Sequence, residues 1–224
     1  MMDWEPLILT FELALVTTIC LLIVSIPLAF WLSRTKTYVK AVIETLVSMP
    51  LVLPPTVLGF YFLLAFSPGN AFGSWINEWL GIQLVFSFPG LVVASMIYSL
   101  PFMVHPIQSG LSGLSPSLTE AAYVMGRSTW NTLMSVQLPN IKPSLITGIV
   151  LAFAHTIGEF GVVLMIGGSI PGETKVASIA IYEEVEALNY DVANFYSLIL
   201  FVISFLVLFF VYRGHGKNIR SFWK

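Results

Sequence analysis

Long apolar stretches separated by short polar ones dominate the pattern along the chain. About 20 apolar residues in a helix are needed to cross the roughly 30 Å hydrocarbon core of a bilayer. Stretches of that kind predict transmembrane helices at about residues 7–32, 45–66, 86–106, 145–166 and 195–212. Because helices satisfy their backbone hydrogen bonds within one segment, we expect an all-α integral membrane protein with five spans in one domain, residues 1–224.

A polar stretch at about residues 110–142 interrupts this pattern and predicts a short helix that ends at a glycine. The helix is expected to begin at Ser115, with Ser117 and Glu120 at the spacing of a capping box. Gly126 suits the left-handed position that ends such a helix.

A second short helix is expected after this glycine corner. Ser128 can cap it, and Pro139 is expected to end it and to direct the chain toward the fourth span. Any membrane protein with several spans needs polar connectors. The pattern alone therefore leaves open whether the stretch is a simple connector or a surface that docks a partner.

Composition supports the membrane assignment and charge sets its orientation. Hydrophobic residues make up 57% of the chain and charged residues only 10%, against about 25% charged in soluble proteins. Nine of the ten Lys and Arg residues follow the first, third and fifth spans: Arg34, Lys36, Lys40, Arg127, Lys142, Arg213, Lys217, Arg220 and Lys224. Since basic loops stay in the cytoplasm, we expect the N-terminus outside and the C-terminus inside. Nothing in the pattern suggests a nucleic-acid partner.

The chemistry-bearing residues are too few for an enzyme or a metal centre. Cys20 is the single cysteine, so neither an internal disulfide nor a cluster of thiolate ligands can form. An intramembrane enzyme would need paired carboxylates, a Ser and His arrangement or a His-Glu-x-x-His motif at depth, and the sequence has none of these. We expect no catalytic residue, no metal ligand and no cofactor bound by this chain.

Three prolines in six residues mark the second span. Pro50, Pro54 and Pro55, followed by Thr56, must bend the helix, because each proline lacks a donor and crowds the carbonyl four residues before it. Two interpretations stay open. The bend is a packing kink, or these residues line a pathway through the protein, where polar backbone at membrane depth is tolerated.

His155 and Glu159 are ionisable residues inside the fourth predicted span. At a spacing of four they would share one helix face, and such residues inside a membrane have a structural or functional role. We favour a bracing role, in which Glu159 accepts hydrogen bonds from His155 or from the backbone of a neighbouring helix. A gate is the alternative.

The polar stretch resembles the coupling motif of ABC-importer permeases. Glu-Ala-Ala, a glycine after three residues, an aliphatic residue after nine more, and Leu-Pro after one more are all present. The matching residues are Glu120, Ala121, Ala122, Gly126, Val136, Leu138 and Pro139. The resemblance implies that Glu120, Ala121, Ala122, Gly126, Leu138 and Pro139 couple the chain to a partner ATPase.

That resemblance also implies an architecture and a set of partners. They are the type I ABC-importer permease fold, a second copy of the chain, a cytoplasmic ABC ATPase dimer that uses ATP and Mg²⁺, and an extracytoplasmic oxyanion-binding protein. The setting implied is the cytoplasmic (inner) membrane of a prokaryote, with membrane lipid around the spans. No Lys or Arg lies deep in a span, which agrees with a pathway that binds an anion weakly.

Three further segments narrow the resemblance to the permeases of molybdate importers. They are PLVLPP at residues 50–55, GEFG at 158–161 and IPGET at 170–174. Molybdate is the expected cargo and tungstate a companion. A sulfate or thiosulfate importer is the alternative, and an ion-coupled carrier without an ATPase is a weaker one. Relatives often carry Arg where this chain has His155, and this departure argues against any role that needs a permanent positive charge at that position.

Overall fold

The computed structural model describes residues 3–219, and the regular structure in that range is helical. Arg220 and Lys224, two of the basic residues counted above, lie outside the described residues. The elements are α1 (Glu5–Arg34), α2 (Tyr38–Ser48), η1 (Met49–Leu51), α3 (Pro55–Phe66), α4 (Ala71–Leu80), α5 (Phe88–Ser112), α6 (Pro116–Val124), α7 (Thr129–Thr132), η2 (Leu133–Gln137), α8 (Leu138–Asn140), α9 (Lys142–Ile157), α10 (Gly161–Gly167), α11 (Ala177–Glu186) and α12 (Tyr190–Ile219).

Helices α1, α5 and α12 contain three of the expected spans. Each is long and apolar enough to cross a membrane, and the described chain has up to five such crossings if each of two bent helix pairs counts as one. The all-helical membrane fold is therefore confirmed. Helix α5 continues to Ser112, six residues beyond the expected end of the third span.

The second expected span is a sharply bent pair rather than one helix. The helical segments Tyr38–Leu51 and Pro55–Phe66 meet at 112°. Pro54 has an extended ψ of 137° and Pro55 begins the next helix, as suits a residue whose ring presets a helical φ but which has no donor. The predicted bend is confirmed, and the helical segments on either side of it, with the bend between them, cover residues 45–66.

The fourth expected span, residues 145–166, is also interrupted. Helix α9 ends at Ile157, Phe160 leaves helical geometry with φ −128° and ψ −59°, and α10 starts at Gly161. Glycine costs a helix about 1 kcal/mol relative to alanine, so a segment with a glycine at each end is a weak point for helix propagation. A second bend, of 81°, separates Thr129–Asn140 from α9.

Helices α1, α5 and α9 form the centre of the molecule, with one apolar cluster toward each end. Leu13, Leu91 and Val162 are buried in the first cluster, which joins α1, α5 and α10. Leu21 and Met103 are buried in the second, which reaches the segment between α7 and α9. These clusters join the central helices to α3 and α10 at one end and, at the other, to the polar stretch at about residues 110–142, called the polar connector from here on.

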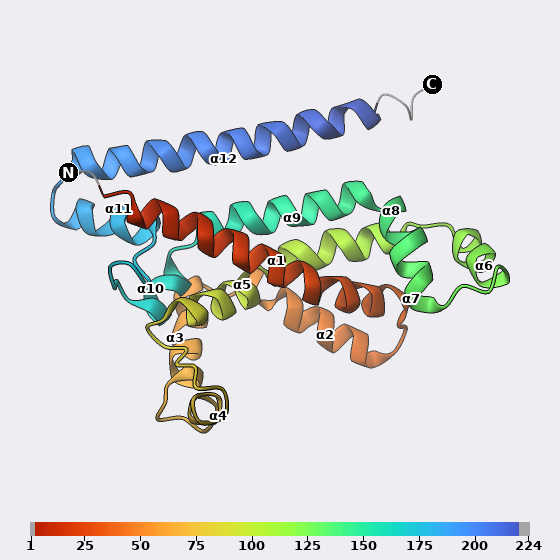
Figure 1. The fold of residues 1–224 in the computed structure, drawn as a ribbon, viewed down its shortest axis with the longest axis horizontal. Coiled ribbons are helices and arrows are strands. Elements are labelled where there is room, and N and C mark those ends of the chain that lie inside the picture. Colours follow the sequence, from red (N-terminus) through yellow and green to blue (C-terminus); the bar gives the residue numbers. More distant parts are fainter. Residues whose placement is uncertain (1–2, 220–224) are drawn as a thin grey trace.

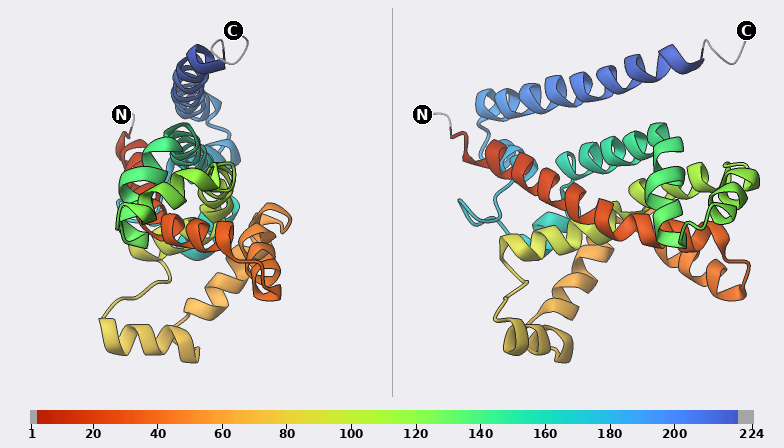
Figure 2. Two further views of the ribbon diagram at one scale, coloured as in Figure 1. Left: turned by 90° about the vertical axis from the view of Figure 1, so that its right-hand side faces the viewer. Right: turned by 45° about the vertical axis from the view of Figure 1, so that its right-hand side comes forward.

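Figure 1 shows the polar connector and the N-terminus at opposite ends of the molecule. Helices α6 and α7 lie at the end where α1 finishes and toward which α12 runs, and α11 lies near the N-terminus. Helices α3 and α4 project from the body as an arm, which Figure 2 shows from two further sides. This arrangement puts the connector and most of the basic loops at one end, as the charge pattern predicts.

The loop between α10 and α11 is held by one buried threonine. Thr174 Oγ1 donates to the Gly167 carbonyl at 2.7 Å and accepts from the Ile170 amide at 3.0 Å. Next to it, Lys175 Nζ lies 2.6 Å from a Glu183 carboxylate oxygen. The IPGET segment at residues 170–174, one of those that resemble molybdate importers, thus ends in a threonine whose contacts hold the shape of the loop.

Candidate functional site

Helix α3 packs directly against α10, and each helix has a glycine at the contact. A Cβ atom at Gly161 would lie 2.8 Å from Pro55 Cβ, and one at Gly59 would lie 2.7 Å from Met165 Cβ. Both distances are shorter than the optimal separation of about 3.5–4.0 Å between non-bonded carbon atoms. The proline segment and the GEFG segment, about 100 residues apart in the sequence, therefore meet in one place.

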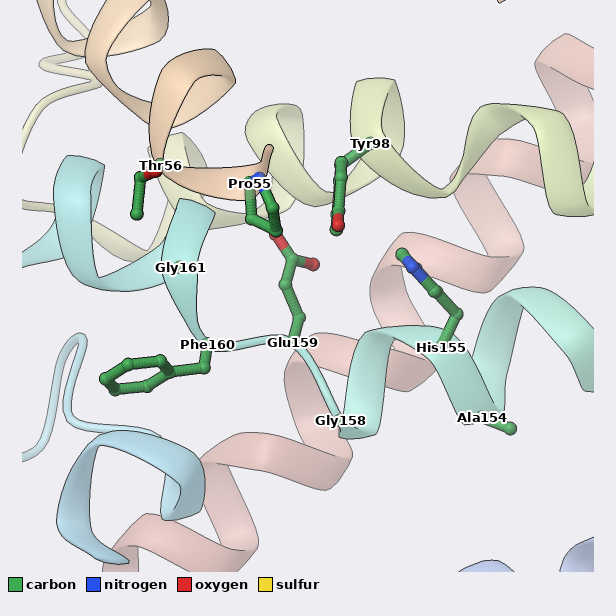
Figure 3. Close-up of a pocket in the computed structure, with 9 residues that line it drawn as sticks. All are labelled: Pro55, Thr56, Tyr98, Ala154, His155, Gly158, Glu159, Phe160 and Gly161. Atoms are coloured by element: carbon green, nitrogen blue, oxygen red, sulfur yellow. The ribbon is translucent and has the colours of Figure 1, made fainter. Parts of the chain in front are cut away.

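A partly open pocket of about 490 Å³ lies where these segments meet. Its lining comes from α3, α5, α9 and the break before α10: Pro55, Thr56, Tyr98, Ala154, His155, Gly158, Glu159, Phe160 and Gly161. Figure 3 shows the side chains of Glu159, Tyr98 and His155 converging on the same space. The volume falls in the range of about 300–1,000 Å³ that is usual for small-molecule sites.

The pocket gathers most, but not all, of the pathway residues expected from the sequence. Thr56 and Pro55 line it at the start of α3, and His155 and Glu159 line it from the α9 end. Pro50 and Pro54 are absent from the lining. Pro50 is buried in η1 and Pro54 forms the bend before α3.

The expected pairing of His155 with Glu159 is wrong, because the helix ends between them. His155 Nδ1 instead lies 2.9 Å from Ser99 Oγ on α5. The imidazole ring stacks on Phe102, with ring centroids 4.1 Å apart, and also contacts Tyr98 at 4.8 Å. The aromatic rings and the hydroxyl fix the orientation of the imidazole at the pocket wall.

The expected bracing hydrogen bonds to the Glu159 carboxylate are also absent. The residue is only 4% exposed, and neither carboxylate oxygen has a hydrogen-bond partner in the part of the chain that the structure describes. The neighbouring polar side chain is Ser95, whose hydroxyl lies close enough to interact with the carboxylate, although the contact lacks the geometry of a hydrogen bond. Ser178 Oγ donates at 2.6 Å to the backbone carbonyl of Glu159, which holds the main chain but not the carboxyl group.

The glycine corner of the polar connector forms as the sequence predicts. Gly126 has φ +77°, and a Cβ atom there would meet nothing within 4 Å. The Arg127 amide reaches back to the Ala122 carbonyl at 3.1 Å, and Ser128 Oγ accepts from the Asn131 amide at 3.3 Å. Gly126 is therefore required for its left-handed backbone, not for lack of space.

Two details of the connector differ from expectation. The capping box of Ser117 and Glu120 does not form, because Ser117 lies inside α6 and its hydroxyl lies 2.7 Å from that of Ser115, which itself makes no side-chain cap. Pro139 does not end the second helix. A stretch of π-helix at Leu133–Gln137 precedes it and helical geometry continues to Asn140, since the wider turn removes the need for the donor that proline lacks.

The two alanines of the coupling motif have different surroundings. Ala122 is buried against the body of the protein, whereas Ala121 and Glu120 are exposed. Apolar side chains nearby are also open to the outside, with Val124 88% and Met125 69% exposed. Leu138 is half-buried and Pro139 exposed. Helix α6 thus presents an uncovered, mixed polar and apolar surface at the end of the molecule.

Other residues that fasten the connector were not evident from the sequence. Arg34, at the end of α1, donates to the Tyr123 hydroxyl at 3.0 Å, and Gln137 donates to Thr119 at 2.9 Å. Hydrogen bonds with Thr129 and then Arg34 lower the pKa of Tyr123. Likewise, only the fold brings Tyr98, Ser99 and Phe102 to His155. No spacing rule links residues that lie more than 50 positions apart.

Comparison with known proteins agrees with these observations. The chain is 45% identical, over 95% of its length and 94% of the relative's, to the molybdenum transport system permease protein ModB of Azotobacter vinelandii. It is 34% identical to the probable sulfate transport system permease protein cysT of Marchantia polymorpha, over 92% of this chain and 73% of the relative. The same fold is found in the solved structure of a bacterial alginate ABC transporter in complex with its alginate pentasaccharide-bound periplasmic protein. The TM-score is 0.74 at 19% identity, and the match covers 94% of this chain and 77% of that one.

A family match covers almost all of the described chain and accounts for its features together. Residues 15–220 match the family described as the binding-protein-dependent transport system inner membrane component. Its members are multi-pass membrane subunits of importers and not enzymes. The helical membrane fold, the exposed connector and the pocket between bent helices are consistent with that assignment. The chain belongs to the family of inner-membrane components of binding-protein-dependent transport systems.

Proposed function

We propose that this chain is the permease subunit of an ATP-driven importer of molybdate, with tungstate as a companion substrate. The observation that carries the proposal is the 45% identity, along nearly the whole of both chains, to a molybdenum transport system permease. Sulfate or thiosulfate is the second candidate, because a relative described as a probable sulfate transport system permease shares 34% identity. Both candidates are tetrahedral oxyanions, and both fit a pathway without a buried Lys or Arg.

The connector is the proposed attachment point for a cytoplasmic ABC ATPase. Its exposed surface on α6, with Glu120 and Ala121 outward and Ala122 inward, suits docking in a groove of a partner. Gly126 turns the chain below that surface, and Leu138 and Pro139 lead into α9. The Arg34 contact with Tyr123 joins α6 to α1, so a push on α6 would reach the membrane helices directly.

The proposed assembly contains two copies of the chain, two ATPase subunits and an extracytoplasmic binding protein. The pocket is partly open in a single chain, and a second copy facing it would complete the pathway. Helix α12 is only 11% buried over its apolar window, which leaves it for lipid. The proposed orientation has the N-terminus outside and the connector inside, since nine of ten basic residues follow the first, third and fifth spans.

The pocket lined by Pro55, Thr56, His155 and Glu159 is the proposed passage for the oxyanion, with Pro50 and Pro54 shaping its wall. Alternating access would open it to one side and then the other. Two helical segments joined by a proline bend are a suitable moving part, because the bend already exists and needs no further loss of helical hydrogen bonds. The chain itself needs no cofactor in this scheme, and ATP and Mg²⁺ act at the partner ATPase.

Reconstitution of the complete importer in proteoliposomes tests this function. Binding protein loaded with molybdate is expected to stimulate ATP hydrolysis and uptake, and binding protein incubated with sulfate is not. Stimulation by sulfate but not molybdate would favour the sulfate importer. Uptake that follows a proton gradient without ATP would contradict both and would identify an ion-coupled carrier.

A further inference from the structure

The direction of each hydrogen bond behind His155 can be worked out from the protons available. Thr156 Oγ1 lies 2.9 Å from the Ala152 carbonyl, which can only accept, so the single hydroxyl proton of Thr156 is used there. Ser99 Oγ, 3.1 Å from Thr156 Oγ1, must therefore donate to it. The Ser99 proton is then also used, so the 2.9 Å contact with His155 requires Nδ1 to donate to Ser99.

Assigning the Thr156 proton to the Ala152 carbonyl in this way places the proton of a neutral His155 on Nδ1. A neutral imidazole with its proton on Nδ1 has a lone pair on Nε2. That atom makes no hydrogen bond with the residues that the structure describes, and His155 lines the pocket. Neutral His155 therefore presents a proton acceptor, not a donor, at the pocket.

Glu159 adds a second acceptor when it is ionised. Its carboxylate is almost completely buried, with the Ser95 hydroxyl as the polar neighbour and no hydrogen bond of normal geometry among the described residues. A buried carboxylate without a cation beside it is strongly disfavoured unless it takes up a proton. No cation faces it in the pocket. Helix α5 presents Tyr98, α9 presents His155, and α11 places Tyr182 against Phe160; the parts of α3 and α10 in the lining carry no titratable side chain.

A neutral His155 and an ionised Glu159 would both present acceptors, with no cation beside them among the described lining residues, and this arrangement disfavours an oxyanion. The conflict disappears if Glu159 carries a proton, because the carboxylic acid O–H then becomes a donor. Tyr98 O–H and Thr56 O–H lie in the same lining and add two more neutral donors. Neutral donors bind an anion less tightly than a buried cation would, so the anion can also leave the pocket, as conduction requires.

We propose that Glu159 is a proton-controlled valve, protonated and donating to the oxyanion as it passes the pocket, and closing the pocket to the anion when ionised. This proposal rests on the oxyanion import proposed above. The proton comes from water and returns to water, so no other reactant is needed. It departs from simple bracing, because the carboxyl group acts on the cargo rather than on a neighbouring helix.

Uptake of labelled molybdate by the complete importer in proteoliposomes, measured across pH values equal on both sides, tests the valve. Each variant is compared with the wild type at each pH, because the ratio cancels the pH dependence of the ATPase and the binding protein. Glu159→Gln resembles the protonated side chain at every pH. The ratio of Glu159→Gln to wild-type uptake is therefore expected to rise with pH, by up to about tenfold per pH unit for a single controlling proton.

Two further variants identify the group that holds the proton. His155→Asn retains an N–H for Ser99 but removes Nε2, and its own pH profile should still fall with pH as the wild type does. Glu12→Gln changes an exposed carboxyl on α1, and its ratio to the wild type should be flat. A flat ratio for Glu159→Gln, or a His155→Asn variant that alone loses the pH dependence, would overturn the assignment of the valve to Glu159.

The outcomes separate this proposal from the proposed function. Wild-type importer that takes up no molybdate at any pH contradicts the function itself. Wild-type importer that transports while the Glu159→Gln ratio stays flat contradicts only the valve. Loss of assembly or of all transport in Glu159→Gln also overturns the valve, since glutamine matches the neutral acid in shape and charge.

Discussion

The contact between α10 and α3 should not tolerate even one added methyl group at Gly161. Its Cβ would lie 2.8 Å from Pro55 Cβ and 3.4 Å from the Thr56 amide nitrogen. Neither neighbour is the end of a flexible side chain, since one belongs to a proline ring and the other to the backbone. Gly161→Ala must therefore push the start of α3 away from α10.

The expected cost follows from that geometry. Overpacking a well-filled interior costs about 1–3 kcal/mol. Alanine returns part of this, up to about 1 kcal/mol, because it favours helix more than glycine does. Setting the full gain against the middle of the cost range, about 2 kcal/mol, leaves a net loss of about 1 kcal/mol. With about 2–4 °C per kcal/mol for a chain of this length, the unfolding temperature should fall by about 2–4 °C.

Gly158→Ala is the matched control, three residues away in the same segment. A Cβ at Gly158 would meet nothing closer than 3.8 Å, and its φ of −86° is open to alanine. Thermal unfolding of the assembled importer in detergent, followed by tryptophan fluorescence, should show a decrease for Gly161→Ala and little change for Gly158→Ala. Equal unfolding temperatures for the two variants would refute the argument from close packing.

Three further predictions concern the connector and the outer loop. Gly126 has φ +77° and open space around it. A left-handed backbone costs most other residues about 1–2 kcal/mol but costs asparagine less. Gly126→Leu should therefore uncouple ATP hydrolysis from uptake, whereas Gly126→Asn should keep most of the coupling. If the two variants behave alike, backbone conformation is not the reason. Thr174→Val leaves the Ile170 amide and the Gly167 carbonyl without their hydrogen-bond partner. It should lower the free energy of unfolding by about 1–3 kcal/mol, measured by heat or denaturant, whereas Thr174→Ser should be near neutral. Equal losses for the two variants would contradict this. Burial raises the pKa of Glu183, but hydrogen bonds led by the one from Lys175 outweigh that effect and lower the pKa from 4.5. The ionised carboxylate therefore stabilises the folded protein above pH 4.5, and this contribution is lost as the pH falls through the lowered pKa. Glu183→Gln should remove this acid-side loss of stability, and an unchanged unfolding profile between pH 3 and 6 would argue against it.

Local patterns in the sequence were sufficient for the features that depend on neighbours along the chain. Apolar length predicts the helices, because burying backbone in a bilayer requires internal hydrogen bonds whatever the tertiary fold. Pro54 and Pro55 predict the bend, and Gly126 predicts the left-handed corner, since both residue types restrict or free their own backbone. The motif that indicates a coupling element is likewise contained in one short stretch.

Tertiary structure decided everything that depends on residues far apart. Gly161 meets Pro55, and His155 finds Ser99 instead of Glu159, because a break in helix α9 rotates the carboxylate away from the face that the spacing predicted. Whether that break forms depends on competition between a weak helical segment and the packing of α10 against α3, and no local rule measures that competition. The sequence by itself determined a helical membrane protein with a coupling motif. Only the fold revealed a buried carboxylate in a pocket with no hydrogen-bond partner of normal geometry among the described residues, because pairing is a property of packed neighbours.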